Sequence, residues 1–211
     1  ICWPNRVGLV KVCGDVSMKF EYAQGVTPID PDEIAGLIPT HITTQGELNE
    51  WEQTNILQGL KWALRQKRRE LLDEGFVRDL HQHMLGQTWK WAGQFRKSDK
   101  NIGVDWLQVP TQLRNLLEDV KVQIEYHTYD ADEIALRFHH RLVWIHPFAN
   151  GNGRHARLMA DLLIGRLGQP AFSWGGQSLV NASEKRQAYL AALRAADQRD
   201  YSPLISFARS S

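Results

Sequence analysis

Cysteine is nearly absent from this 211-residue chain, which has only Cys2 and Cys13. Neither a disulfide framework nor a cysteine-based zinc cluster is therefore expected to support the fold. Apolar runs of about 18 residues are also missing, so the sequence predicts no transmembrane helix. Positive and negative side chains nearly cancel, with a net charge of +1, which favours neither nucleic-acid nor membrane partners. These features are typical of a cytoplasmic protein with one ordinary core.

The first 17 residues differ in character from the rest. The sequence MKF at Met18 reads like a natural start. Residues 1–17 lack the apolar segment of about 7–15 residues that a signal peptide contains. We therefore expect residues 1–17 to be an extension that is not native. Residues 18–46 are expected to form an N-terminal lead-in rich in proline, and residues 47–211 the functional domain.

Apolar residues recur at helical spacing through most of that domain. The pattern predicts one or two helices between residues 47 and 74, stopped by Gly75, and a short helix over residues 76–86. Further helices are expected over residues 110–125, 130–145, 152–167, 183–197 and 201–208. Residues 87–108 contain tryptophan, valine and isoleucine broken by glycine, which predicts a short β-hairpin. The expected fold class is mainly α with one hairpin.

The most informative segment is HPFANGNGRHAR, residues 146–157. His146 is a candidate general base, because imidazole accepts protons near neutral pH. The glycine-rich turn that follows opens a helix, where backbone N–H groups converge on anions. Arg154 and Arg157 lie one helical turn apart and are suited to phosphate oxygens. Each of these residues alone fits a core histidine or an ordinary turn, but no packing rule requires the ordered set.

Each residue of the turn has an expected role. Gly151 and Gly153 allow the backbone to approach a phosphate closely. Asn152 can direct its side-chain amide and its backbone N–H at the same anion. Asn150 offers a carbonyl oxygen to Mg²⁺, which takes oxygen ligands and binds substrate phosphates. The turn therefore predicts a nucleotide-phosphate site with a weak metal position.

This segment closely resembles the signature of the Fic (Fido-domain) family, HPFx(D/E)GNGRxxR. The resemblance extends to WAGQFR at residues 91–96, to RQAYL at residues 186–190 and to DYSPLI at residues 200–205. Residues 18–46 resemble the lead-in of a bacterial Fic subgroup associated with mobile elements, and a toxin–antitoxin-like role is expected on this resemblance. The resemblance implies a Fic-type helical domain.

The resemblance also implies an enzyme that transfers AMP from ATP, with Mg²⁺, to a Ser, Thr or Tyr hydroxyl of a protein target. His146 would deprotonate that hydroxyl, and Asn150 would take the metal position. Residues 151–153 would surround the phosphates, while Arg154 and Arg157 would contact the β- and γ-phosphates.

In the family, a flap upstream of the signature docks the target segment by strand addition. The hairpin expected over residues 87–108 occupies this place. The residues that the resemblance assigns to the flap are Phe95, Arg96, Ile102, Gly103 and Val104.

Many Fic proteins inhibit themselves through a helix with the pattern (S/T)xxxE(G/N), whose glutamate pairs with the second signature arginine. The nearest match is TNILQG, from Thr54 to Gly59, with Gln58 in place of the glutamate. An amide forms no charge-assisted pair with Arg157, although it can still hydrogen-bond. Partial self-inhibition and inhibition by a partner protein are both open, and ordinary helix surface is the alternative.

Three other activities remain as alternatives. Phosphate transfer of the Doc type is disfavoured, because those relatives carry lysine where this chain has Gly153. Removal of AMP from targets relies on the inhibitory glutamate, which Gln58 replaces. A catalytically weak nucleotide- or protein-binding module is favoured only by Asn150, where the family usually has a carboxylate.

The histidines His81, His83, His139 and His140 lack zinc-ligand spacing and are expected to pack within the fold.

Overall fold

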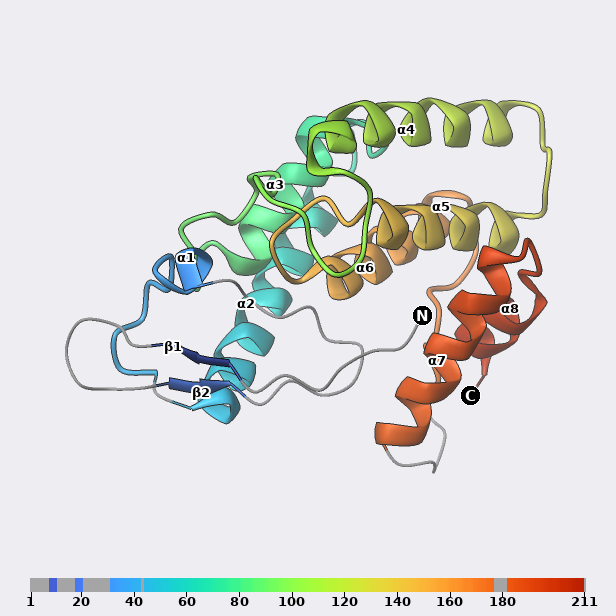
Figure 1. The fold of residues 1–211 in the computed structure, drawn as a ribbon. Helices are drawn as coiled ribbons and strands as arrows, with labels where there is room; N and C mark the ends of the chain where they lie inside the picture. The colour runs from blue at the N-terminus through green and yellow to red at the C-terminus, as the bar shows by residue number, and fades with distance from the viewer. Residues whose placement is uncertain (1–7, 11–17, 21–30, 43, 177–181, 211) are drawn as a thin grey trace.

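The computed structural model describes residues 8–10, 18–20, 31–42, 44–176 and 182–210 (Figure 1). Two short strands, β1 (Gly8–Val10) and β2 (Met18–Phe20), pair antiparallel with Val10 opposite Met18. β2 thus begins at the expected native start and pairs with the preceding segment. The described helices are α1 (Pro31–Ile34), α2 (Gln45–Arg65), α3 (Glu74–Leu85), α4 (Val109–Glu125), α5 (Ala131–Ile145), α6 (Asn152–Arg166), α7 (Ala182–Asp197) and α8 (Ser202–Arg209), with a 3-10 turn, η1, at Trp106–Gln108.

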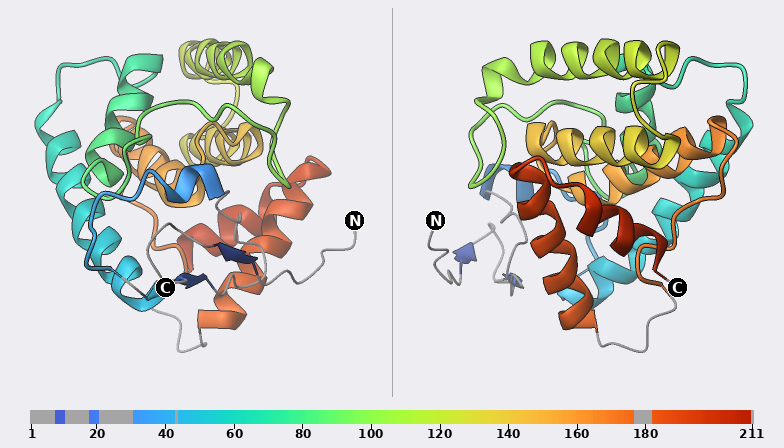
Figure 2. Two further views of the ribbon diagram at one scale, coloured as in Figure 1. Left: turned by 60° about the vertical axis from the view of Figure 1, so that its left-hand side comes forward. Right: turned by 90° about the vertical axis from the view of Figure 1, so that its right-hand side faces the viewer.

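The expectation of a mainly helical fold is confirmed. α5 lies between α4 and α6, with the axes of α4 and α5 nearly aligned (Figures 1 and 2). α2 packs on α3, and both α7 and α8 contact α5. Leu136, Phe138 and Leu142 of α5 are buried. None of the described helices has both the length and the hydropathy that crossing a bilayer would require.

The helix expected between residues 47 and 74 is shorter than predicted. α2 starts with a capping box in which Thr44 and Glu47 bond each other's backbone N–H at 3.3 and 3.0 Å, and it ends at Arg65. Gly75 does not end the preceding helix as expected, because it lies in the first turn of α3. Asp73 caps that helix by accepting the N–H of Phe76 at 3.1 Å. The cap residue, rather than the glycine, therefore defines this boundary.

The predicted hairpin over residues 87–108 was wrong in its pairing. Among the described residues, Trp89 forms an isolated antiparallel bridge with Leu37, next to the bonds from Ile38 N–H to Thr88 C=O and from Lys90 N–H to Gly36 C=O. The tryptophan-rich stretch around Trp89 thus pairs with residues 36–38. The rest of the segment is a loop as far as η1, and within it the buried Arg96 side chain supplies hydrogen bonds that a strand ladder would have made.

Candidate active site

His146 ends α5 and turns the chain towards α6. Its backbone is left-handed (φ 55°, ψ 60°), and its N–H still donates to Leu142 C=O at 3.2 Å. The residue is only 5% exposed, and its Nδ1 lies 3.3 Å from Val143 C=O. Because a carbonyl accepts only, Nδ1 carries the proton and Nε2 keeps a lone pair. Burial lowers the pKa of His146 to about 4, with a smaller contribution from the cations of Arg96 and Lys100.

Asn152 fixes the turn between His146 and α6, contrary to its expected side-chain role. Its Oδ1 accepts Phe148 N–H at 2.9 Å, and its Nδ2 donates to Phe148 C=O at 2.8 Å. Asn152 is only 3% exposed, so its amide needs protein partners. The side chain is therefore unavailable to a phosphate, and only the backbone N–H remains for that role.

The two glycines of the turn, Gly151 and Gly153, have different surroundings. Gly151 precedes α6 with φ 78°, and a Cβ there would meet Leu85 Cδ1 at 2.5 Å. Gly153 has no heavy atom within 4 Å of a Cβ position. The start of α6 is therefore packed on one side and open on the other. The first N–H groups of a helix have no acceptor within it, so the open side is suited to an anion.

Asn150, the expected metal ligand, is folded back onto the turn. Its Oδ1 accepts Gly151 N–H at 2.5 Å, and its backbone C=O accepts a hydrogen bond from His81 Nε2 at 3.0 Å. The amide oxygen thus covers one of the donors expected to face a phosphate. Among the described residues, no cluster of three or more histidine, cysteine, aspartate or glutamate side chains is suited to a metal ion.

The two signature arginines point to different neighbours. Arg154 Nη1 pairs with Glu52 Oε2 of α2 at 2.6 Å, and Glu52 Oε1 also accepts Trp89 Nε1–H at 2.7 Å. Arg157 lies over the ring of Tyr189 at 4.6 Å. No described group accepts a hydrogen bond from the buried Nε of Arg157, so this donor lacks the partner that a buried N–H requires.

The structure does not bring the expected inhibitory residues of α2 to Arg157. Thr54 is exposed and donates to Glu50 C=O at 3.3 Å, while the exposed Gln58 accepts from Gln87 Nε2 at 2.9 Å. Gly59 packs against Met84. The α2 residue that reaches the signature is Glu52, which the sequence analysis missed. The available signal was its position four residues after the buried Leu48, where an acid sits on the apolar face.

Arg96 holds the flap loop together from within. It is 3% exposed, and its guanidinium donates to His146 C=O at 2.7 Å, to Ser98 C=O at 2.9 Å and to Val104 C=O. Burial lowers its pKa. Its backbone N–H also donates to Pro147 C=O at 2.9 Å. One side chain thus replaces the missing strand ladder, and Arg96 itself offers no surface to a docked target.

The other flap residues rest on the same centre. Gly103 (φ 105°) lies so close to His146 that a Cβ would be 2.7 Å from the histidine Cβ. Val104 is buried and Ile102 is half-buried. The ring of Phe95 lies 6.1 Å from that of Phe148. The loop is therefore in direct contact with the candidate base.

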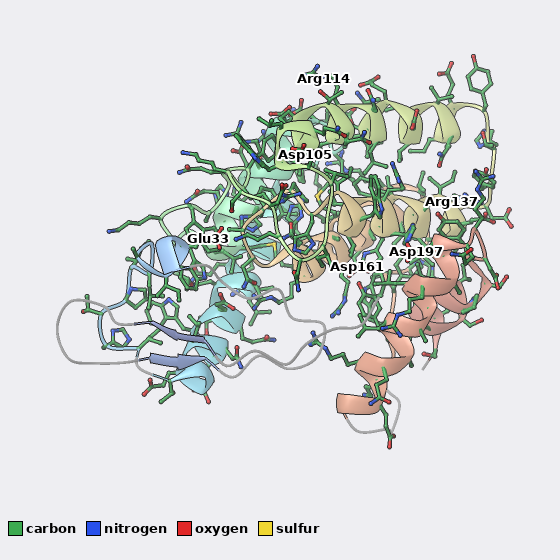
Figure 3. The ribbon with its side chains drawn as sticks, viewed as in Figure 1. Glu33, Asp105, Arg114, Arg137, Asp161 and Asp197 are labelled. Carbon is green, nitrogen blue, oxygen red and sulfur yellow. The ribbon has the colours of Figure 1, made fainter. Side chains whose placement is uncertain are left out.

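A partly buried ion pair connects Lys100 of the flap loop to Glu33 of α1. Lys100 Nζ lies 2.7 Å from Glu33 Oε1, and the two side chains are 2% and 15% exposed. Figure 3 shows Glu33 on α1, beside the loop that contains Asp105. Trp91 Nε1 also donates to Glu33 C=O at 3.0 Å. Glu33 thus connects α1 of the lead-in to the flap loop.

The remaining histidines pack as expected. His139 Nε2 lies 2.9 Å from Tyr189 Oη, and His140 Nε2 lies 2.8 Å from Asp197 Oδ1. His83 stacks on Trp62 with ring centroids 4.1 Å apart.

The structure thus combines a mainly helical fold with a histidine at the end of α5, an open start of α6 at Gly153, and two arginines in the first turns of α6. Residues 71–164 match the model of the Fic/DOC family.

Curated proteins similar to this chain include two protein adenylyltransferases. The chain is 28% identical over 156 residues to protein adenylyltransferase fic-1 of Caenorhabditis elegans, covering 72% of this chain and 29% of that protein. It is 27% identical over 135 residues to protein adenylyltransferase Fic of Aedes aegypti, covering 62% and 26% respectively. The chain therefore spans less than a third of the length of these curated relatives.

Solved structures agree on the fold. A Caenorhabditis elegans Fic-1 fragment (residues 134–508, E274G) is 27% identical, with a TM-score of 0.60, and the match covers 75% of this chain and 48% of that one. BepC of Bartonella tribocorum, solved with bound AMPPNP, is 16% identical with a TM-score of 0.60, covering 80% of this chain and 87% of that one.

Proposed function

We propose that this protein is an adenylyltransferase that moves AMP from ATP to a Ser, Thr or Tyr hydroxyl of a protein target. The observation that carries the proposal is the position of a neutral His146 close to the open start of α6. The turn between them is held by the hydrogen bonds of Asn152. This arrangement supports a role for His146 as proton acceptor beside a bound phosphate. The names of the relatives support the same reaction.

The chemistry follows from these positions. The triphosphate binds at the start of α6 and at Arg157, whose buried Nε gains an acceptor. The target hydroxyl gives its proton to His146 Nε2 while its oxygen attacks the α-phosphorus. The bond from that phosphorus to the α–β bridging oxygen breaks, and pyrophosphate leaves. Val143 C=O stabilises the imidazolium through Nδ1–H, and the α6 donors stabilise the developing phosphate charge.

Magnesium fits this site only as a companion of the nucleotide. The chain offers one amide oxygen, Asn150 Oδ1, and a lone neutral ligand holds a dication weakly. Asn150 would hold the metal after releasing Gly151 N–H, with the phosphates as the main ligands. When bound, Mg²⁺ supplies charge neutralisation at the phosphates.

Labelled ATP tests the function. Wild type incubated with α-labelled ATP and lysate is expected to place label on protein, and His146→Ala is expected to place none. His83→Ala, in an exposed histidine of α3, is the matched control and is expected to transfer as wild type does. Protein label from γ-labelled ATP alone would instead establish Doc-type phosphate transfer. Nucleotide binding with no label from either substrate would establish a binding module.

The wider setting is proposed on the sequence resemblance. We propose that residues 18–46 are the lead-in of a bacterial mobile-element subgroup and that a partner protein regulates the enzyme. The position of Gln58 supports external regulation, because it contacts Gln87 away from Arg157. The division into residues 1–17, 18–46 and 47–211 stays a prediction, as does a cytoplasmic location.

A further inference from the structure

A histidine outside the signature joins the phosphate turn to the flap. His81, on α3, is fully buried. Its Nδ1 accepts Gly93 N–H at 2.9 Å, and its Nε2 lies 3.0 Å from Asn150 C=O. Its ring stacks on Phe148 at a centroid distance of 3.7 Å and an angle of 20°. The imidazole is therefore held on both edges and one face.

These partners fix the tautomer of His81. Gly93 N–H can only donate, so Nδ1 is the unprotonated nitrogen. Asn150 C=O can only accept, so Nε2 carries the hydrogen. Burial keeps the pKa of His81 well below its ordinary value, and the neighbouring His155 acts in the same direction. The ring is thus neutral, with one donor and one acceptor at assigned positions.

The bond to Asn150 orients the peptide that leads into Gly151. In a trans peptide the C=O and the following N–H point in opposite directions, and the described residues contain no cis peptide. With the carbonyl held inward by His81, Gly151 N–H points outward, where it meets Asn150 Oδ1 at 2.5 Å. The reversed peptide would present a carbonyl oxygen to the phosphate and repel it.

Packing prevents the ring from adjusting independently. A Cβ on Gly151 would lie 3.4 Å from His81 Nε2. On the other side, Gly93 (φ 73°) is held by its C=O, which accepts from Arg78 Nε at 3.0 Å. Gly93 thus restrains the His81 ring, and the ring in turn restrains the Asn150–Gly151 peptide.

We propose that His81 is a positioning residue that holds the Asn150–Gly151 peptide with its N–H facing the nucleotide phosphates. This rests on the proposed function, since the anion concerned is the ATP of that reaction. His81 contacts no substrate and transfers no proton. Its effect is on nucleotide affinity, through the direction of one backbone donor.

Two substitutions of His81 distinguish the effect of its hydrogen bond to Asn150 from that of its hydrogen bond to Gly93. In His81→Gln the side-chain amide reaches the place of Nε2 and restores the donor to Asn150. In His81→Asn the shorter side chain reaches the place of Nδ1 and restores only the acceptor for Gly93. Each variant leaves one buried backbone group unpaired, so similar losses of melting temperature are expected. His155→Gln is the control, since His155 is equally buried but bonds Val77 C=O.

Calorimetric titration with ATP and Mg²⁺ gives the decisive comparison. His81→Gln and His155→Gln are expected to bind within about threefold of wild type, and His81→Asn about tenfold more weakly, the cost of one misdirected donor. Equal affinities of the Gln and Asn variants would refute the proposal. Nitrogen NMR of the wild-type ring is a second test that needs no variant, and a protonated Nδ1 would also refute it. Wild type that binds ATP but transfers no AMP contradicts only the proposed function.

Discussion

At the residue scale, the site depends on side chains bound to backbone more than on side chains facing solvent. His146, Asn152 and Arg96 all direct hydrogen bonds to carbonyls or N–H groups of the loops around the turn. The sequence motif predicted which residues gather here. It did not predict these orientations, because a buried amide such as that of Asn152 satisfies the nearest unpaired backbone, and that depends on the folded turn.

Glu52 gives the first prediction at this scale. Glu52→Gln removes the charge that holds Arg154 on α2, while the amide oxygen can still accept from Trp89. Arg154 is then released towards the phosphates. We expect ATP to bind several-fold more tightly, as measured by calorimetry. Glu50→Gln, an exposed change on the same helix, is the control and should bind as wild type does. Unchanged or weaker binding in Glu52→Gln would show that the pair is purely structural.

At the scale of elements, the helices were predictable and the flap was not. Periodicity and caps located α3 to α8 closely, because each buries one apolar face. Residues 87–108 have the composition of a hairpin, but the bonds of this segment run to residues 36–38 and to the Arg96 guanidinium. Partners that lie far away in sequence leave no local pattern.

Arg96 provides the prediction for this element. Arg96→Lys replaces a planar group that bonds several carbonyls with one ammonium, so the flap loosens against His146. Transfer of labelled AMP to protein is expected to fall at least about tenfold, while ATP affinity stays within about threefold. Lys97→Ala, at the exposed neighbouring position, should leave both unchanged. A matching loss of ATP affinity would mean that the loop supports the nucleotide site as well.

At the scale of the whole molecule, buried neutral histidines link stability to pH. Burial is the main reason that the pKa falls to about 3 for His139 and to about 4 for His146 and His155. An unfolded histidine titrates near about 6.5. Between these values the unfolded chain binds more protons than the folded one, so stability is present above about pH 6.5 and is lost as the pH falls towards 4.

Urea unfolding at pH 7 and pH 5 measures this linkage. The free energy of unfolding is expected to be lower at pH 5 by on the order of 1 kcal/mol for each such histidine. His155→Gln removes one titrating group and should make the pH dependence shallower. A stability that is equal at both pH values would contradict the neutral, buried state of these rings.

The chain of contacts from Trp89 through Glu52 to Arg154 has an optical consequence. The indole N–H of Trp89 lies 2.7 Å from the carboxylate that holds the arginine, and its ring is fully buried, 5.0 Å from that of Trp91. When Arg154 turns to a phosphate, a positive charge leaves the neighbourhood of the indole. The emission spectrum of Trp89 should then shift, so the protein contains its own fluorescent reporter of nucleotide occupancy.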